Sequence, residues 1–380
     1  MKTIRLFYIF VVVALLVACG AGGRSDDRPT RKPTAEGPTT APTPAPTPAP
    51  NEYRTPNTYS VKVFDNYTVS DAKRNRKFSI LIRYPVGAPS PLPLIIWSHG
   101  GASNDNGHHS YEEWGIALAR AGYAVIHVAH ADDKYEAHCA PLKIPANECE
   151  LSDFKKEVLE GGTLLVAFYN RPRDASTILD DLDNIERAAN LKFDRDRIGA
   201  AGHSGGTSTV MSLAGAVLDV SPSVHNLASA DPRFKAFLAS SPGGIGHLGL
   251  TANSWDKINV PVMVTTGAED NHKGGDGGAF SQQAKDRLDA FKRLPPSDKY
   301  QLYIDSKEAT HKIFGFGSDG LSAPTTGTVS NETLQLQAYI EASGIAFLDA
   351  YVRGLPEAKT WLNSDNMKLW SKGIATITTK

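Results

Sequence analysis

The chain has 380 residues and a formal net charge of −1 at neutral pH, and 41% of its residues are hydrophobic. A charge balance this close to neutral argues against a protein that binds nucleic acid or an anionic surface through charge. The length and the hydrophobic content suit one large α/β domain with appendages.

Residues 1–18 have the pattern of a signal peptide: Lys2 and Arg5 are basic, and residues 6–17 form an apolar run too short to span a bilayer. The closing Leu-Val-Ala-Cys resembles the lipobox of bacterial lipoproteins, in which the cysteine after the cleavage point receives lipid. The resemblance implies that Cys19 is lipidated and begins the mature chain, which would anchor it stably to a membrane. Because neither of the next two residues is aspartate, we expect the outer membrane or the cell surface. The alternative is an ordinary signal peptide in which Cys19 is incidental.

Residues 19–57 are rich in proline, threonine and alanine, a composition that cannot bury a core and favours an extended chain. We interpret them as a tether for a domain at residues 58–380. Export would place Cys139 and Cys149 in an oxidising compartment, so we expect a disulfide between them. Both lie in residues 132–170, which we expect to form a lid or rim over the site.

An apolar strand is predicted at residues 91–98, followed by His99-Gly100-Gly101. This segment resembles the HGG-type loop of esterases, whose backbone N–H groups bind an oxyanion. We therefore expect the N–H of Gly101 to be an oxyanion donor and His99 to be structural. A simple glycine turn is the alternative.

Residues 202–206 match the nucleophile-elbow pattern G-x-S-x-G, between a predicted strand at 197–201 and a predicted helix at 207–218. In this context Ser204 would project from a strained turn, beside the N-terminus of the helix. We expect Ser204 to be a nucleophile and the N–H of Gly205 to be the second oxyanion donor. His203 should point away from the serine, and a glycine-rich turn without catalytic function remains the alternative.

A serine nucleophile needs a base and an acid, which follow it in the chain order Ser, Asp/Glu, His in this class of site. The next predicted strand, 259–266, ends at Glu269 and Asp270, and Asp270 is the better candidate for the acid. The strand after that, 300–304, precedes His311, which we expect to be the base. Glu269 as the acid, His272 as the base and a solvated loop carboxylate stay open as alternatives.

Together these motifs resemble the α/β-hydrolases related to platelet-activating-factor acetylhydrolases, predicted dienelactone hydrolases and polyester-cleaving hydrolases. The resemblance covers roughly residues 92–362 and rests on five segments: 98–101, 121–126, 171–182 (expected to open a helix), 193–198 and 347–351. It implies an α/β-hydrolase fold, with a mostly parallel, doubly wound sheet, helices on both faces and a lid-like insertion.

Two departures from these families refine the expectation. Dienelactone hydrolases use a cysteine nucleophile, which Ser204 replaces. The animal platelet-activating-factor enzymes carry their acid where this chain has Ser240-Ser241. The acid should therefore come from the later strand, as in the bacterial polyester and lipase-like members, which again favours Asp270.

These features predict a serine-dependent carboxylic ester hydrolase that works through an acyl-enzyme on a small or polymeric ester, outside the cytoplasm. No cofactor is expected. The histidines at positions 108, 109, 127, 130 and 138 lack a metal-ligand spacing, so no catalytic metal is expected either. A serine peptidase or amidase of the same fold, and a non-catalytic binding lipoprotein, remain alternatives. The oligomeric state is left open.

Overall fold

The computed structural model describes residues 49–101, 107–130, 165–219, 225–272, 282–316 and 329–380. The predicted signal peptide, the lipidation site Cys19, most of the tether, both Cys139 and Cys149, and residues 132–164 of the expected lid lie outside the described residues. Within the described part, no helix combines the length and the apolar character that crossing a bilayer requires.

The fold is α/β, with a mixed and mostly parallel central sheet. Nine strands of the described residues form it, in the order β1-β2-β4-β3-β5-β8-β9-β10-β11. Neighbours from β4 to β10 pair in parallel, and β1, β2 and β11 add antiparallel edges. The strands are β1 (Ser60–Asp71), β2 (Arg76–Val86), β3 (Leu92–Ser98), β4 (Ala124–Val128), β5 (Phe193–His203), β8 (Ala236–Ser240), β9 (Val262–Gly267), β10 (Lys299–Ile304) and β11 (Ala375–Thr379). A separate two-stranded sheet joins β6 (Val217–Leu218) to β7 (Leu227–Ala228).

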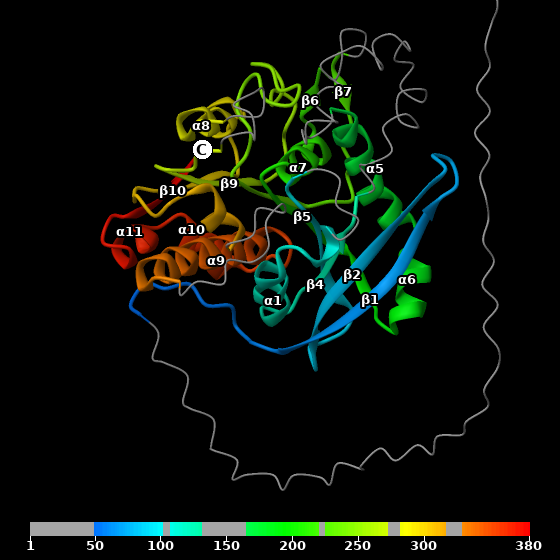
Figure 1. Ribbon diagram of the computed structural model, residues 1–380. Coiled ribbons are helices and arrows are strands. Elements are labelled where there is room, and N and C mark those ends of the chain that lie inside the picture. Colours follow the sequence, from blue (N-terminus) through cyan, green and yellow to red (C-terminus); the bar gives the residue numbers. More distant parts are fainter. Residues whose placement is uncertain (1–48, 102–106, 131–164, 220–224, 273–281, 317–328) are drawn as a thin grey trace, which may run out of the picture. The chain divides into compact units, whose positions relative to one another are not determined.

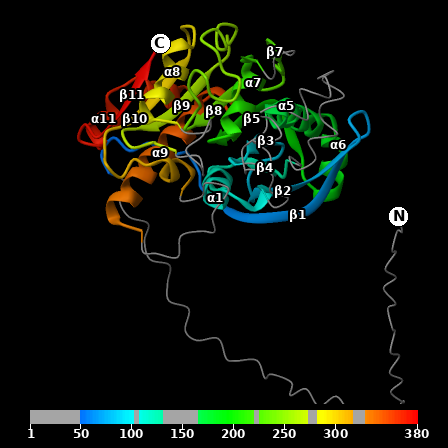
Figure 2. The same ribbon diagram turned by 45° about the horizontal axis from the view of Figure 1, so that its top comes forward.

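Helices cover both faces of the central sheet, as Figures 1 and 2 show. One face packs against α5 (Leu165–Asp180), α6 (Leu182–Ala189), α7 (Gly206–Ala214) and α8 (Ala284–Arg293). The other packs against α1 (Glu112–Arg120), α9 (Asn331–Tyr351), α10 (Pro356–Leu362) and α11 (Asn366–Trp370). Two short 3₁₀ helices, η1 (Gly107–His109) and η2 (His311–Gly315), follow the loops after β3 and β10.

Strand β3 illustrates why the sheet lies between two helical layers. Leu94 and Ile96 belong to one apolar cluster, whereas Ile95 and Trp97 belong to the other, as the two-residue period of a strand requires. Every residue of β3 is buried. A continuous apolar strand of this kind is typical of a parallel sheet covered on both faces.

Some predicted boundaries differ from the structure. The helix after the elbow ends at Ala214 and not at residue 218, because Gly215 adopts a left-handed conformation (φ 116°) that terminates it. Helix α5 begins at Leu165 and not at Arg171, so residues 165–170 of the expected lid belong to a helix. There Arg173 lies over the ring of Tyr169, one turn earlier, and donates to its carbonyl.

The folded region also begins earlier than residue 58. The Tyr53 hydroxyl donates to Oδ2 of Asp349 at 2.7 Å, and the Trp361 indole donates to the carbonyl of Asn51 at 2.8 Å. Tyr53 is 8% exposed and packs on Trp361 with ring centroids 5.5 Å apart. The Tyr53 side chain and the Asn51 carbonyl thus hold the end of the proline-rich segment on α9 and α10.

Candidate active site

The carboxyl ends of the central strands meet at one edge of the sheet, where parallel α/β sheets commonly bind ligands. Strand β3 ends before His99, β5 before Ser204, β9 before Asp270 and β10 before His311. Residues far apart in the chain are therefore brought together here.

Ser204 occupies a strained turn between β5 and α7. Its φ is 54°, a left-handed value that non-glycine residues rarely adopt, and its N–H donates to the carbonyl of Ser240 at 2.9 Å. A Cβ on Gly206 would lie 2.1 Å from the carbonyl oxygen of Ser98, so only glycine fits there. A Cβ on Gly205 would find no heavy atom closer than 3.5 Å, so of the two glycines after Ser204 it is Gly206 that provides the close approach of α7 to β3.

Ser204, His311 and Asp270 form one hydrogen-bonded series. Nε2 of His311 lies 2.9 Å from Oγ of Ser204, and Nδ1 of His311 lies 2.8 Å from Oδ1 of Asp270. Asp270 is fully buried and His311 is 5% exposed. Of the two candidate acids, only Asp270 contacts His311, whereas Glu269 is exposed and accepts from Asn271.

The other histidines near the site do not occupy the position of the base. The ring of His272 packs beside that of His311, with centroids 5.0 Å apart, but His311 makes the contacts to both Ser204 and Asp270. His203 is buried, and burial together with the neighbouring His311 holds the pKa of its imidazole well below the usual value. It is therefore a neutral ring.

Hydrogen bonds through His203 connect the loop after β3 to His311. Nε2 of His203 lies 3.0 Å from the carbonyl oxygen of His311, which can only accept, so this nitrogen carries the hydrogen. Nδ1 must then accept, and the Tyr111 hydroxyl lies 3.1 Å away. The same hydroxyl accepts the N–H of Gly100 at 3.1 Å. Tyr111 and His203 thus fix the position of the glycine loop relative to the backbone of His311.

Sequence reasoning missed Arg287 of α8, which lies against the buried acid. Its Nε is 3.0 Å from Oδ1 of Asp270 and donates to the Asp270 carbonyl at 2.7 Å. Burial by itself raises the pKa of the Asp270 carboxyl, but the charge of Arg287 and the hydrogen bond from His311 outweigh it and lower the pKa to about 2. Asp270 is therefore ionised at neutral pH.

Sequence reasoning also missed the function of Arg171 in α5. The guanidinium is fully buried, and it donates to the carbonyl of His99 at 2.7 Å and to that of Gly101 at 2.6 Å. These two bonds fix the peptide group before Gly100 and the one after Gly101, which flank the peptide that carries the Gly101 N–H. No local sequence pattern connects an arginine of α5 to this loop.

The N–H groups of Gly101 and Gly205 lie on facing backbone segments. A Cβ built on Gly205 would be 3.5 Å from the Gly101 nitrogen, and one on Gly100 would be 3.0 Å from Cβ of Ser204. Neither the Gly101 nor the Gly205 N–H has an acceptor in the part of the chain that the structure describes. Among the described residues, no backbone carbonyl competes with a ligand for these two N–H groups.

A second Ser-His-Asp series lies inside the protein. Nε2 of His130 is 3.0 Å from Oγ of Ser98, and Nδ1 of His130 is 3.0 Å from Oδ2 of Asp174. All three residues are at most 3% exposed, and Arg76 pairs with Asp174 at 3.0 Å. Because substrate cannot reach Ser98, this series is a structural network that joins β3, α5 and β2.

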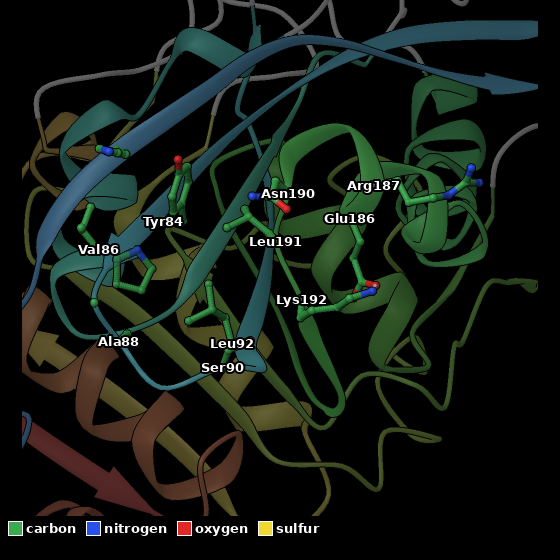
Figure 3. Close-up of a pocket in the computed structure, with 13 residues that line it drawn as sticks. Tyr84, Val86, Ala88, Ser90, Leu92, Glu186, Arg187, Asn190, Leu191 and Lys192 are labelled. Carbon is green, nitrogen blue, oxygen red and sulfur yellow. The ribbon is translucent and has the colours of Figure 1, made fainter.

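A cavity of about 530 Å³ lies away from Ser204, His311 and Asp270. Figure 3 shows its wall of side chains from the end of β2, the start of β3 and the end of α6, including Tyr84, Leu92 and Leu191. Leu92 begins β3, whereas the loop beside Ser204 follows the other end of that strand. The cavity is thus at the opposite edge of the sheet and contains none of the predicted site residues.

Comparisons with protein-family models and with curated proteins find no match to the chain. The chemical interpretation therefore depends on the arrangement of the side chains themselves.

Proposed function

We propose that the protein is a serine-dependent carboxylic ester hydrolase of the α/β-hydrolase fold that works through an acyl-enzyme. The observation that carries the proposal is the hydrogen-bonded series of Ser204, His311 and Asp270 at the carboxyl edge of the sheet, with Ser204 in a strained strand-to-helix turn. The mostly parallel sheet with helices on both faces supports the same fold.

In this mechanism Nε2 of His311 takes the proton of the Ser204 hydroxyl while Oγ forms a bond to the ester carbonyl carbon. The carbonyl oxygen becomes an oxyanion, which would accept hydrogen bonds from the N–H groups of Gly101 and Gly205. Collapse of this intermediate breaks the bond to the alcohol, and His311 returns the proton to the leaving oxygen. Water, deprotonated by the same imidazole, then releases the acid and restores Ser204.

Asp270 and Arg287 would set the electrostatics of the base. The ionised carboxylate of Asp270 accepts from Nδ1 of His311, which leaves Nε2 free to take a proton and stabilises the imidazolium that forms. Arg287 offsets part of this negative charge, because it contacts the same carboxylate oxygen.

We also propose that Cys19 carries a lipid anchor and that the domain acts outside the cytoplasm. The support is the lipobox-like sequence that ends at Cys19. In cells given a clickable fatty acid, the wild-type chain should become labelled, and a Cys19→Ser chain should not.

The catalytic proposal is tested with Ser204→Ala and a short-chain p-nitrophenyl ester. Loss of the nucleophile should lower kcat by about 10⁶. A fluorophosphonate should add one phosphonyl group to the wild-type protein and none to the Ser204→Ala protein, as judged by intact mass. An unlabelled wild-type chain would indicate a non-catalytic binding domain. Faster turnover of a matched peptide amide than of the ester would indicate a peptidase or amidase.

A further inference from the structure

Three potential metal ligands from two distant segments meet beside η1. Asp65 lies in β1 where the pairing with β2 shifts register, between Phe64 and Tyr67. An irregularity of this kind bends a strand and redirects its side chains. It brings Oδ1 of Asp65 to 3.9 Å from Nε2 of His108 and Oδ2 to 3.7 Å from Nε2 of His109.

The spacing of these atoms suits a bound cation better than direct hydrogen bonds. The two N···O separations exceed the usual range of about 2.7 to 3.2 Å for a hydrogen bond. One ligand atom from each of Asp65, His108 and His109 lies within 4.8 Å of the others. Around tetrahedral zinc, with ligands at about 2.0 to 2.2 Å, neighbouring ligand atoms lie about 3.3 Å apart. Since the separations extend to 4.8 Å, the three side chains would together have to close a difference of up to about 1.5 Å.

One ligand is fixed and the other two can be reached from solvent. The His108 side chain is 5% exposed, whereas those of His109 and Asp65 are 46% and 31% exposed. Gly107, the first residue of η1, lies so close to the ring of His99 that a Cβ there would be 2.3 Å from it. The two histidines thus follow a tightly packed residue, Gly107. A metal ion could reach them from the solvent-exposed side of His109 and Asp65.

The local charge is compatible with a cation. The positive charge of Arg83, in β2, acts on His108. Nη2 of Arg83 lies 3.6 Å from Oε1 of Glu112, and this carboxylate offsets the charge of Arg83. Neutral imidazoles together with a carboxylate form a donor set suited to zinc and other late first-row metals, in contrast to the oxygen-rich sets of calcium and magnesium.

We propose that Asp65, His108 and His109 bind a divalent transition-metal cation of the zinc class, with water completing the coordination. The metal would fasten η1, which packs on the loop beside Ser204, to strand β1. The inference does not depend on the proposed hydrolase activity, because none of its ligands belongs to the catalytic series. A metal-ligand motif in the sequence could not have found it, since the carboxylate comes from a strand 43 positions before the first histidine.

The test uses the tag-free full-length chain, stripped of metal with a chelator and dialysed. Titration with Zn²⁺ by calorimetry should give one equivalent bound, and Co²⁺ should give the visible absorption of a low-symmetry N/O site. His109→Ala and Asp65→Asn should each weaken Zn²⁺ binding by about 100-fold or more, because loss of even an outer partner costs 10- to 100-fold.

His225→Ala is the matched control. His225 is also an exposed histidine beside a carboxylate, with Nδ1 3.4 Å from Oδ2 of Asp219. Among the described residues, however, it belongs to no group of three potential metal ligands. Its removal should leave the affinity for Zn²⁺ unchanged. The proposal is overturned if the wild-type chain binds no equivalent of Zn²⁺. It is equally overturned if His109→Ala and Asp65→Asn bind as tightly as the wild type, or if binding is instead lost in His272→Ala.

Discussion

Replacing Asp270 by Asn isolates the electrostatic contribution of the buried acid. Oδ1 of Asp270 faces two donors, Nδ1 of His311 at 2.8 Å and Nε of Arg287 at 3.0 Å, and Oδ2 accepts from the Thr266 hydroxyl at 2.8 Å. The amide of Asn should therefore place its oxygen at the Oδ1 position and its NH₂ group towards Thr266, whose hydroxyl can accept. His311 would keep its orientation and its tautomer. Only the negative charge of the neighbouring carboxylate would be lost.

The size of the effect follows from the charge separation. A carboxylate and an imidazolium about 4 Å apart attract by about 4 kcal/mol at an effective dielectric constant near 20. This corresponds to a loss of about 10³ in kcat for Asp270→Asn. The expected loss is smaller than the roughly 10⁴ found where the same change produces the wrong histidine tautomer.

The assay is steady-state hydrolysis of a p-nitrophenyl ester, with the fold checked by circular dichroism. Asp270→Asn leaves Arg287 buried without its carboxylate, and breaking a buried pair costs about 3 to 5 kcal/mol, so rates must be measured well below the lowered Tm. The Asp270→Asn/Arg287→Met double variant should recover stability without recovering kcat.

Glu269→Gln is the control, because this neighbouring carboxylate is exposed and contacts Asn271. It should change kcat less than twofold. The reasoning is refuted if folded Asp270→Asn loses less than tenfold in kcat, or if Glu269→Gln loses as much as Asp270→Asn.

Three further predictions concern the surroundings of the site. Arg171→Met should lower kcat by about 10² with little change in KM, because the loop that carries the proposed oxyanion donor loses two hydrogen bonds. A wild-type kcat would contradict the positioning function of Arg171. Gly206→Ala should lower Tm far more than Gly205→Ala. The added methyl would lie 2.1 Å from a carbonyl oxygen at position 206, but no closer than 3.5 Å to any atom at position 205. Equal Tm values would refute the steric argument. The pKa of Asp174 falls from 3.8 to about 2 because its hydrogen bond from His130 and the charges of Arg76 and Arg74 outweigh burial, so its stabilisation should be complete above about pH 4 and decline as the pH falls towards 2. Urea unfolding at pH 6 and pH 3 should therefore show a smaller acid-induced loss of stability in Asp174→Asn than in the wild type.

Much of the fold and of the candidate site follows from local patterns. The buried apolar run of β3, the strand, turn and helix around Ser204 and the later strands before Asp270 and His311 can each be recognised within a few residues. This is possible because strand and helix periodicities, and the need for glycine at the elbow, are properties of short segments. The choice of Asp270 over Glu269 also began in the sequence, through the position of each residue after its strand.

Other features depend on contacts between segments that no short pattern connects. The sequence alone determined the order of Ser204, Asp270 and His311 and the edge of the sheet at which they meet. Tertiary packing decided that Arg171 secures the loop at Gly101, that Arg287 keeps the acid ionised, and that a bent strand carries a carboxylate to the two histidines of η1. Side chains such as these are selected by what packs against them, and that is known only once the sheet has brought distant segments together.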